Sequence, residues 1–226
     1  MGESTMARPA ARPGLTAERV VQAAAAVADR EGLHGVSMRR VGRELGVEAM
    51  SLYHHVASKD ALLDALGDWL MERVERPPAD VAWREGIRVR CHSLRAVMRE
   101  HPWGPAIVES RRAPGLALLG HLEAVLDCLH RGGFQVQLAA HAFSVLDAYV
   151  YGFVLTEQSL PFEPGGGVDA LAEEMAVPAD VFPRMAAFIE QAIVGRSYDY
   201  GDEFAYGLEL VLDGLESRLA EAADSR

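Results

Sequence analysis

SMRRVGRELGVEAMSLYHHVASK, residues 37–59, is the stretch of sequence that decides the fold. Apolar residues recur at helical spacing on both sides of Gly46, which predicts two short helices, 37–45 and about 49–55. Glycine suits the turn between them because it adopts the positive φ that an abrupt helix end requires. Two short helices joined by a tight turn are typical of a helix-turn-helix, so the sequence predicts a unit that reads DNA.

The second of these helices turns its small polar and ring side chains away from the core. Leu52 and Val56 face the first helix, and the helical spacing then sets the outward side. Hydroxyl, phenol and imidazole groups on a short helix suit a major groove, where base edges and thymine methyl groups are read. The outward residues are Ala49, Met50, Ser51, Tyr53, His54 and His55.

Helical patterns extend from this stretch in both directions. Toward the N-terminus, a helix begins at the N-cap Thr16 and ends at Gly32, and residues 1–14 form a flexible arm without an apolar pattern. Toward the C-terminus, Ser58 begins a helix that ends before Pro77. Further helices are predicted at about 83–100, 103–111, 115–131, 135–160, 183–194 and 202–222, with a loop containing Gly and Pro over 161–181.

The sequence predicts an all-α protein, because no segment alternates apolar and polar residues over more than a few positions. We expect a three-helix helix-turn-helix domain over residues 15–60. It is joined to a larger helical bundle over residues 61–226 that binds a ligand and dimerises. We expect dimerisation through the last helix and the helix at 135–160. These two helices from each of two copies would form a four-helix bundle. The apolar stripe of the last helix is broader than one buried face requires and consists of Phe204, Leu208, Val211, Leu212, Leu215 and Leu219.

Charge is divided unevenly along the chain. The net charge is −11, but residues 1–60 carry eight Lys and Arg against seven Asp and Glu, whereas the remainder carries fourteen against twenty-six. A near-neutral reading domain on an acidic body remains compatible with phosphate binding.

The chain shows the signs of a cytoplasmic protein. Its first residues, MGESTMARPAARPG, lack the apolar core of a signal peptide, and no apolar run approaches the roughly 18 residues of a membrane span. Cys91 and Cys128 lie far apart within helical patterns, which favours reduced thiols over a disulfide. We therefore expect no membrane association.

Three strings carry a resemblance to a known family: LTAERV at 15–20, SMRRVGRELGV at 37–47 and SLYHHVASKDALLDAL at 51–66. With them the chain resembles the tetracycline-repressor (TetR) family, whose recognition helix and following helix carry Leu-Tyr-x-His-Val/Phe and then Lys-x-x-Leu-Leu. Later strings are similar, in the expected order, to the family's C-terminal domain. They are REHPW at 99–103, LHRGGF at 129–134, YGFVLTE at 151–157 and FAYGLELVLDGLE at 204–216.

The resemblance implies DNA contacts at matching positions. Two residues at the start of the first helix approach phosphate or a base edge, and two in the first turn of the recognition helix face bases. Residues after them contact phosphates or bases, and a lysine that begins the next helix binds phosphate. In that order the residues are Ser37 and Arg39; Met50 and Ser51; Tyr53, His55 and, by its outward position, His54; and Lys59.

Three positions depart from the family's pattern. Gly42 stands where Ala is usual, which should cost about 1 kcal/mol of helix stability. Glu48 stands where a Ser or Thr N-cap is common, and Ala49 stands where Pro or Gln is often found. The last two departures leave open a helical ligand-binding dimer that no longer binds DNA.

A small-molecule sensor needs a largely apolar pocket between helices with a few polar anchors. We expect this pocket between the helices spanning 83–131 and the first half of 135–160, where the aromatic content indicates a small hydrophobic effector. The candidate lining residues are His101, Trp103, Ile107, Leu118, Leu122, Phe143, Leu146 and Tyr149.

Motifs for metal binding and catalysis are missing from the sequence. The histidines include no H-x-x-x-H pair, and there is no G-x-S-x-G. The sequence thus predicts no cofactor, no metal and no enzyme activity. It favours a dimeric, ligand-responsive repressor that binds a palindromic operator and is released by its effector. A dimer that no longer binds DNA, and a helical enzyme or protein-interaction module, remain alternatives.

Overall fold

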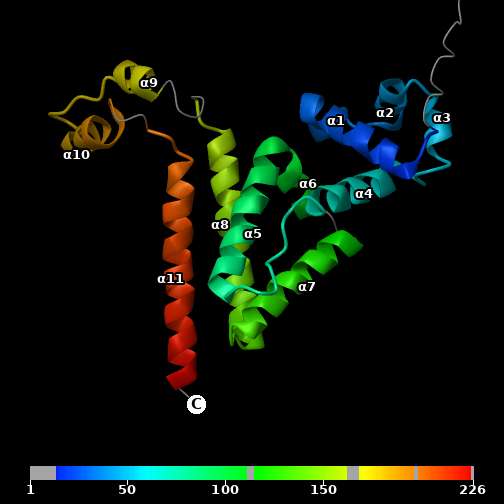
Figure 1. The fold of residues 1–226 in the computed structure, drawn as a ribbon. Helices are drawn as coiled ribbons and strands as arrows, with labels where there is room; N and C mark the ends of the chain where they lie inside the picture. Colours follow the sequence, from blue (N-terminus) through cyan, green and yellow to red (C-terminus); the bar gives the residue numbers. More distant parts are fainter. Residues whose placement is uncertain (1–13, 111–114, 162–167, 196–197, 225–226) are drawn as a thin grey trace, which may run out of the picture.

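The computed structural model describes residues 14–110, 115–161, 168–195 and 198–224, and within these residues all regular structure is helical. The all-α prediction is thereby confirmed, while most of the predicted arm, residues 1–13, lies outside the described part (Figure 1). The elements are α1 (Ala17–Gly35), α2 (Met38–Leu45), α3 (Ala49–Leu52), α4 (Lys59–Met71), α5 (Trp83–Glu100), α6 (Gly104–Ser110), α7 (Leu116–Arg131), α8 (Val136–Gln158), α9 (Val168–Met175), α10 (Pro183–Phe188), the π-helical η1 (Ile189–Ile193) and α11 (Asp202–Asp224).

Local sequence sets where the N-terminal helices begin and end. The hydroxyls of Thr16, Ser37 and Ser58 each accept the backbone N–H three residues later, at 3.2, 3.2 and 3.0 Å. Gly46 has φ of 69° and closes α2, and Gly32 has φ of 71° and kinks α1. The predicted N-caps and the predicted turn at Gly46 are therefore confirmed, whereas the predicted helix end at Gly32 is wrong because α1 continues past its kink to Gly35.

Helix α4 connects the N-terminal helices to the rest of the chain. It packs against α1 on one side and against α6 and α7 on the other. Leu62, Leu66 and Leu70 lie along it at helical spacing and are fully buried. Figure 1 shows α1 running alongside α4 with α2 and α3 near it on the outer side, while α7 passes below α4 and α5 and α8 lie beyond its other end. We call α1, α2 and α3 the head, and α5 to α8 together with α11 the body; α4 connects the two.

Helix α11 completes the body by packing along α5 and α8. Phe204 is fully buried at its start, and Arg95 of α5 stands 4.8 Å from the centre of that ring. Arg95 also donates to Glu157 of α8 at 2.6 Å. One arginine thus links three helices.

The predicted loop over 161–181 is wrong in part, because Val168–Met175 forms α9. Its sequence, VDALAEEM, is rich in good helix formers, and the Gly and Pro residues on either side misled the prediction. Several other helices are shorter than predicted: α3 ends at Leu52, α4 ends at Met71, and 183–194 divides into α10 and η1. Together α9, α10 and η1 stand apart from the other helices (Figure 1).

Helix α8 is unusually apolar for its length. By length and composition alone it could cross a membrane, since its most apolar stretch of 18 residues has a mean hydropathy of 1.5. Asp147 and Glu157 interrupt the apolar run, which is why the sequence shows no continuous segment of that length. Only 28% of the stretch is buried within the chain, so α8 presents apolar surface to the outside.

Candidate nucleic-acid interface and effector site

The turn between α2 and α3 brings their backbones unusually close. A Cβ atom on Gly42 would lie 2.9 Å from the carbonyl oxygen of Val47 and 3.2 Å from the backbone nitrogen of Ala49. Real Cβ atoms essentially never approach backbone below 3.0 Å. The structure thus gives a reason for glycine at this position, since α3 begins against the side of α2 where a methyl group would stand.

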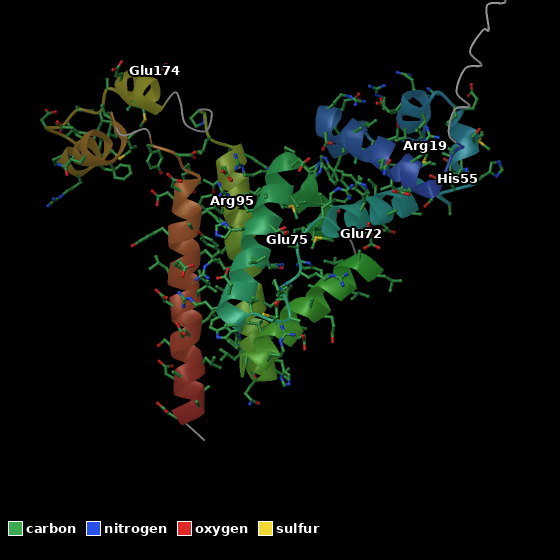
Figure 2. The ribbon with its side chains drawn as sticks, viewed as in Figure 1. Arg19, His55, Glu72, Glu75, Arg95 and Glu174 are labelled. Carbon is green, nitrogen blue, oxygen red and sulfur yellow. The ribbon has the colours of Figure 1, made fainter. Side chains whose placement is uncertain are left out.

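Most of the predicted DNA-binding side chains lie in solvent on the outer surface of the head. Met50 is 73% exposed and Tyr53 45% exposed, while Leu52 between them is fully buried. His55 lies at the outer edge of the head, far from the body (Figure 2). Arg39, His54 and Lys59 are also exposed, and Ser51 is half-buried.

Ser37 and Arg40 both have structural roles in the head. Ser37, from the predicted set, caps α2 through its hydroxyl and is half-buried. Arg40 donates through Nε to Glu31 of α1 at 2.7 Å, which lowers the pKa of that carboxyl. Glu48 precedes α3 but its side chain makes no capping hydrogen bond. Arg40 therefore fixes α2 to α1, while Arg39 beside it remains exposed.

The head contacts the body through an aromatic cluster around Asp29. One carboxylate oxygen of Asp29, on α1, accepts from Nδ1 of His101 at 2.8 Å and from Nε1 of Trp103 at 2.7 Å. Trp69 of α4 stacks on Trp103 and meets the edge of His101. We name these four residues the head–body cluster.

The predicted effector residues do not all converge. His101 and Trp103 belong to the head–body cluster, with Ile107 buried nearby on α6. Tyr149 faces α11, where its hydroxyl donates to the carbonyl oxygen of Phe204 at 2.8 Å. The remaining four lie on the facing helices α7 and α8 and are Leu118, Leu122, Phe143 and Leu146.

Between α5, α7 and α8 lies a buried polar cluster that the sequence analysis missed. Arg90 and His121 are each 1% exposed, and Arg90 Nε donates to His121 Nε2 at 3.0 Å. Arg90 Nη1 lies 2.6 Å from Asp147 Oδ1, although the two groups are not aligned for a hydrogen bond. We name Arg90, His121 and Asp147 the triad. The sequence could have indicated the triad through Arg90. This ionisable residue lies on the helix face that Ile87, Cys91 and Leu94 mark as buried.

Burial governs the electrostatics of the triad. It lowers the pKa of His121 to about 4, with Arg90 and Arg76 adding to the effect. It also raises the pKa of the neighbouring Tyr151, which the charge on Asp147 raises further. His121 and Tyr151 are therefore neutral near pH 7.

The triad is also close to the connection with the head. His121 lies one turn after Leu118 on α7, and the backbone N–H of Leu118 lies 3.4 Å from Oδ1 of Asp68. Asp68 belongs to α4, and its carboxylate stands at the N-terminal end of α7, where negative charge is favourable. Helices α7 and α4 are therefore in direct contact beside the triad.

A separate hollow of about 260 Å³ lies between the end of α7 and the start of α8. Its volume is below the roughly 300–1,000 Å³ of typical ligand pockets. It is lined by Glu123, Leu126, Asp127, His130, Phe134, Val136 and Ala139, none of them among the eight predicted effector residues.

The described residues contain no disulfide and no metal-binding cluster. Cys91 and Cys128 are both buried and unpaired. Within the described residues no group of three His, Cys, Asp or Glu side chains is arranged to hold a metal ion.

Both parts of the chain match known protein families. Residues 20–66 match the family of bacterial regulatory proteins named tetR, and residues 77–219 match the tetracyclin repressor-like C-terminal domain. The chain is 35% identical to the HTH-type transcriptional repressor DrrR1 of Streptomyces coeruleorubidus, over 93% of this chain and 80% of that protein.

Solved structures agree with this match. The fold is similar to apo ActR from Streptomyces coelicolor, with a TM-score of 0.76 and 31% identity over 94% of this chain and all of that chain. ActR in complex with actinorhodin gives a TM-score of 0.73 at 32% identity, over 91% of this chain and 99% of that chain. BioQ with its natural double-stranded DNA operator gives 0.62 at 26% identity, over 90% and 99%.

Proposed function

Because the chain belongs to the tetracycline-repressor family of bacterial transcription regulators, we propose that it is a dimeric repressor released from a palindromic operator by a small hydrophobic effector. The observation that carries the proposal is the surface of α3, where Met50 and Tyr53 are exposed beside the fully buried Leu52. A short helix that exposes apolar and hydroxyl side chains has no core to fill on that side, and it suits the major groove.

On this proposal the head contacts DNA with the eight residues predicted from the sequence. Arg39 and Lys59 would bind phosphates and fix the register, whereas Met50 and Ser51 would face base edges. Ser37 would act through the position it gives to α2, since its hydroxyl already caps that helix. BioQ, whose fold is similar, is known in complex with its DNA operator.

A second copy of the chain would cover α8 and α11. Val145 and Leu155 of α8 and Tyr206 and Leu210 of α11 are large apolar or aromatic residues with about half or more of their surface exposed. Gly214 on α11 has no atom near its Cβ position, so another backbone could approach there. Four helices packed in this way bury the apolar surface of α8 without a membrane.

The separate segment α9–η1 supports the same assembly. It exposes large apolar side chains, and within the chain its helices pack chiefly on one another. Exposed apolar surface of this extent marks an interaction site. We propose that the second copy covers it; the residues are Met175, Val181, Phe182, Met185, Phe188 and Val194.

We place the effector between α5, α7 and α8, next to Leu118, Leu122, Phe143 and Leu146. ActR, whose fold is similar, is known in complex with actinorhodin. From there two routes lead to the head: Asp68 at the start of α7, and the head–body cluster around Asp29. An effector that prefers one position of α7 would shift α4 and so change the spacing of the two heads.

The decisive experiment is selection of a random double-stranded DNA library by the purified protein at moderate salt. A Tyr53→Ala, Lys59→Ala double variant is selected in parallel for comparison. Both side chains are exposed, so their replacement should not affect folding. We expect an enriched palindrome with half-sites about one helical turn apart, lost in the double variant. No enrichment from a folded dimer at low salt would instead favour a ligand-binding protein that no longer reads DNA.

A further inference from the structure

The triad fixes which edge of the His121 ring can bind a ligand. The guanidinium of Arg90 can only donate hydrogen bonds, so His121 Nε2, 3.0 Å from Arg90 Nε, must accept. The ring of neutral His121 therefore carries its proton on Nδ1. Buried groups with a fixed tautomer are well suited to recognise one kind of partner.

His121 Nδ1 has no hydrogen-bond acceptor among the described residues, although it is buried. A buried donor without an acceptor destabilises the protein, so native structures rarely keep one without a reason. A ligand oxygen placed against Nδ1 would satisfy it. His121 thus supplies a polar anchor of the kind that an otherwise apolar site needs.

The charges around His121 select the sign of that partner. Arg90 and Arg76 both disfavour a positive charge on the ring, and Asp147, which forms an ion pair with Arg90, sets one negative charge against these two positive ones. A positive environment favours an oxygen with partial or full negative charge and disfavours an ammonium group.

Apolar side chains lie one helical turn from two members of the triad. Leu118 lies one turn before His121 on α7, and Phe143 lies one turn before Asp147 on α8, so each shares a helix face with a member of the triad. Both are half-buried, whereas Arg90 and His121 are fully enclosed. An aliphatic and an aromatic side chain on α7 and α8 therefore stand between the triad and solvent-exposed positions of these helices.

We propose that His121 donates its Nδ1 hydrogen to a carbonyl or phenolate oxygen of an aromatic effector, and that the site therefore accepts oxygen acceptors and rejects amines. Arg90 and Asp147 act as positioning residues that hold the tautomer. The inference rests on the proposed function, because it names the chemistry of the effector that would release the repressor.

The test uses three aromatic probes of one ring frame: 1,8-dihydroxyanthraquinone, anthracene and 9-(aminomethyl)anthracene. Their affinities are measured by quenching of tryptophan fluorescence in the full chain and in two variants. His121→Phe keeps a ring but removes the donor, while His121→Asn keeps an N–H close to the place of Nδ1. His34→Phe, the same change at an exposed site on α1 that lines no part of the body, is the matched control.

We expect the quinone to bind the wild-type chain more tightly than either other probe. Its affinity should fall about tenfold in His121→Phe and recover to within about threefold in His121→Asn. Anthracene should bind both His121 variants at least as well as the wild type, which a merely misfolded site would not do. The His34→Phe control should match the wild type with all three probes.

Three results would overturn the proposal. They are binding of the amine as tightly as the quinone, unchanged quinone affinity in His121→Phe, and failure of all three probes to bind the wild-type chain. Because these titrations need no DNA, the proposed function is judged separately. A chain that selects no operator but binds the quinone through His121 loses the repressor function and keeps the site.

Discussion

Single residues decide both how the head is built and what the body can bind. Gly42 lets α3 begin against α2, since a side chain there would meet the backbone of Val47 and Ala49. His121 stays neutral in the core because burial and Arg90 oppose its protonation. Each of these residues leads to a measurement of stability.

Gly42→Ala should destabilise the protein by about 1–3 kcal/mol, because the added methyl group forces the turn between α2 and α3 apart. Chemical denaturation monitored by circular dichroism gives the change in the free energy of unfolding. Gly67→Ala is the control, since a Cβ there would meet only Ile107 at 3.9 Å within a helix. It should stabilise by about 1 kcal/mol, and equal effects of both variants would contradict the steric explanation.

Acid should weaken the fold through His121. The folded chain binds its proton only near pH 4, whereas the unfolded chain binds it near pH 6.5. The contribution is therefore complete above pH 6.5 and is lost as the pH falls toward 4, by about 3 kcal/mol in all. Glu209, whose pKa two arginines lower to about 2, loses its smaller, solvent-screened contribution only between pH 4.5 and 2.

The measurement is the free energy of unfolding from pH 7 to pH 4 in the wild type and in His121→Phe. The variant should lose most of the slope above pH 4.5. A slope that is unchanged in the variant would show that other groups take up the proton.

At the scale of helices, sequence predicts local features well and contacts between distant helices poorly. The caps at Thr16, Ser37 and Ser58 depend on a hydroxyl and a backbone N–H three residues away, which one short string of sequence contains. The triad instead joins residues up to 57 positions apart on three helices, and no local pattern shows that Arg90 points at His121.

The candidate site follows the same division. The exposed surface of α3 could be predicted because burial of Leu52 fixes its helical phase. The direction of Tyr149 could not, since its hydroxyl bonds to a backbone oxygen of α11, 55 residues later. His101 and Trp103 were predicted on apolar content alone, and their bond to Asp29 joins them to the head instead.

The head–body cluster should carry the effector signal. Asp29→Ala leaves His101 Nδ1 and Trp103 Nε1 without their acceptor, which should cost about 1–3 kcal/mol of stability and loosen the head. We expect the variant to keep its affinity for the effector but to show weaker release from the operator. Fluorescence anisotropy of labelled operator, titrated with effector, measures both quantities.

Two further variants sharpen this prediction. Asp29→Asn keeps one acceptor oxygen and should retain most of the release. Trp69→Ala removes the ring that stacks on Trp103 and should loosen the coupling in the same way as Asp29→Ala. Full release in both Asp29→Ala and Trp69→Ala would exclude the cluster and leave the contact between Asp68 and α7 as the route.

At the scale of the whole molecule, the proposed function requires two copies. Leu210→Asp places a charge on the exposed apolar surface of α11 and should convert the dimer to a monomer, measured by light scattering after size exclusion. Operator affinity should fall by at least about a hundredfold, because each head would then bind a half-site alone. Ala79→Asp, in the exposed segment between α4 and α5, adds the same charge and should change neither quantity.

The uneven charge of the chain should orient the protein on DNA, because the head and the body lie on opposite sides of α4. Residues 1–60 are nearly neutral, while the remainder carries twelve more acidic than basic side chains. The DNA phosphates would repel the acidic body but not the near-neutral heads. An encounter in which the body faces the DNA would therefore dissociate before a complex forms. Misdirected encounters with the chromosome would thus be brief, which shortens the search for the operator.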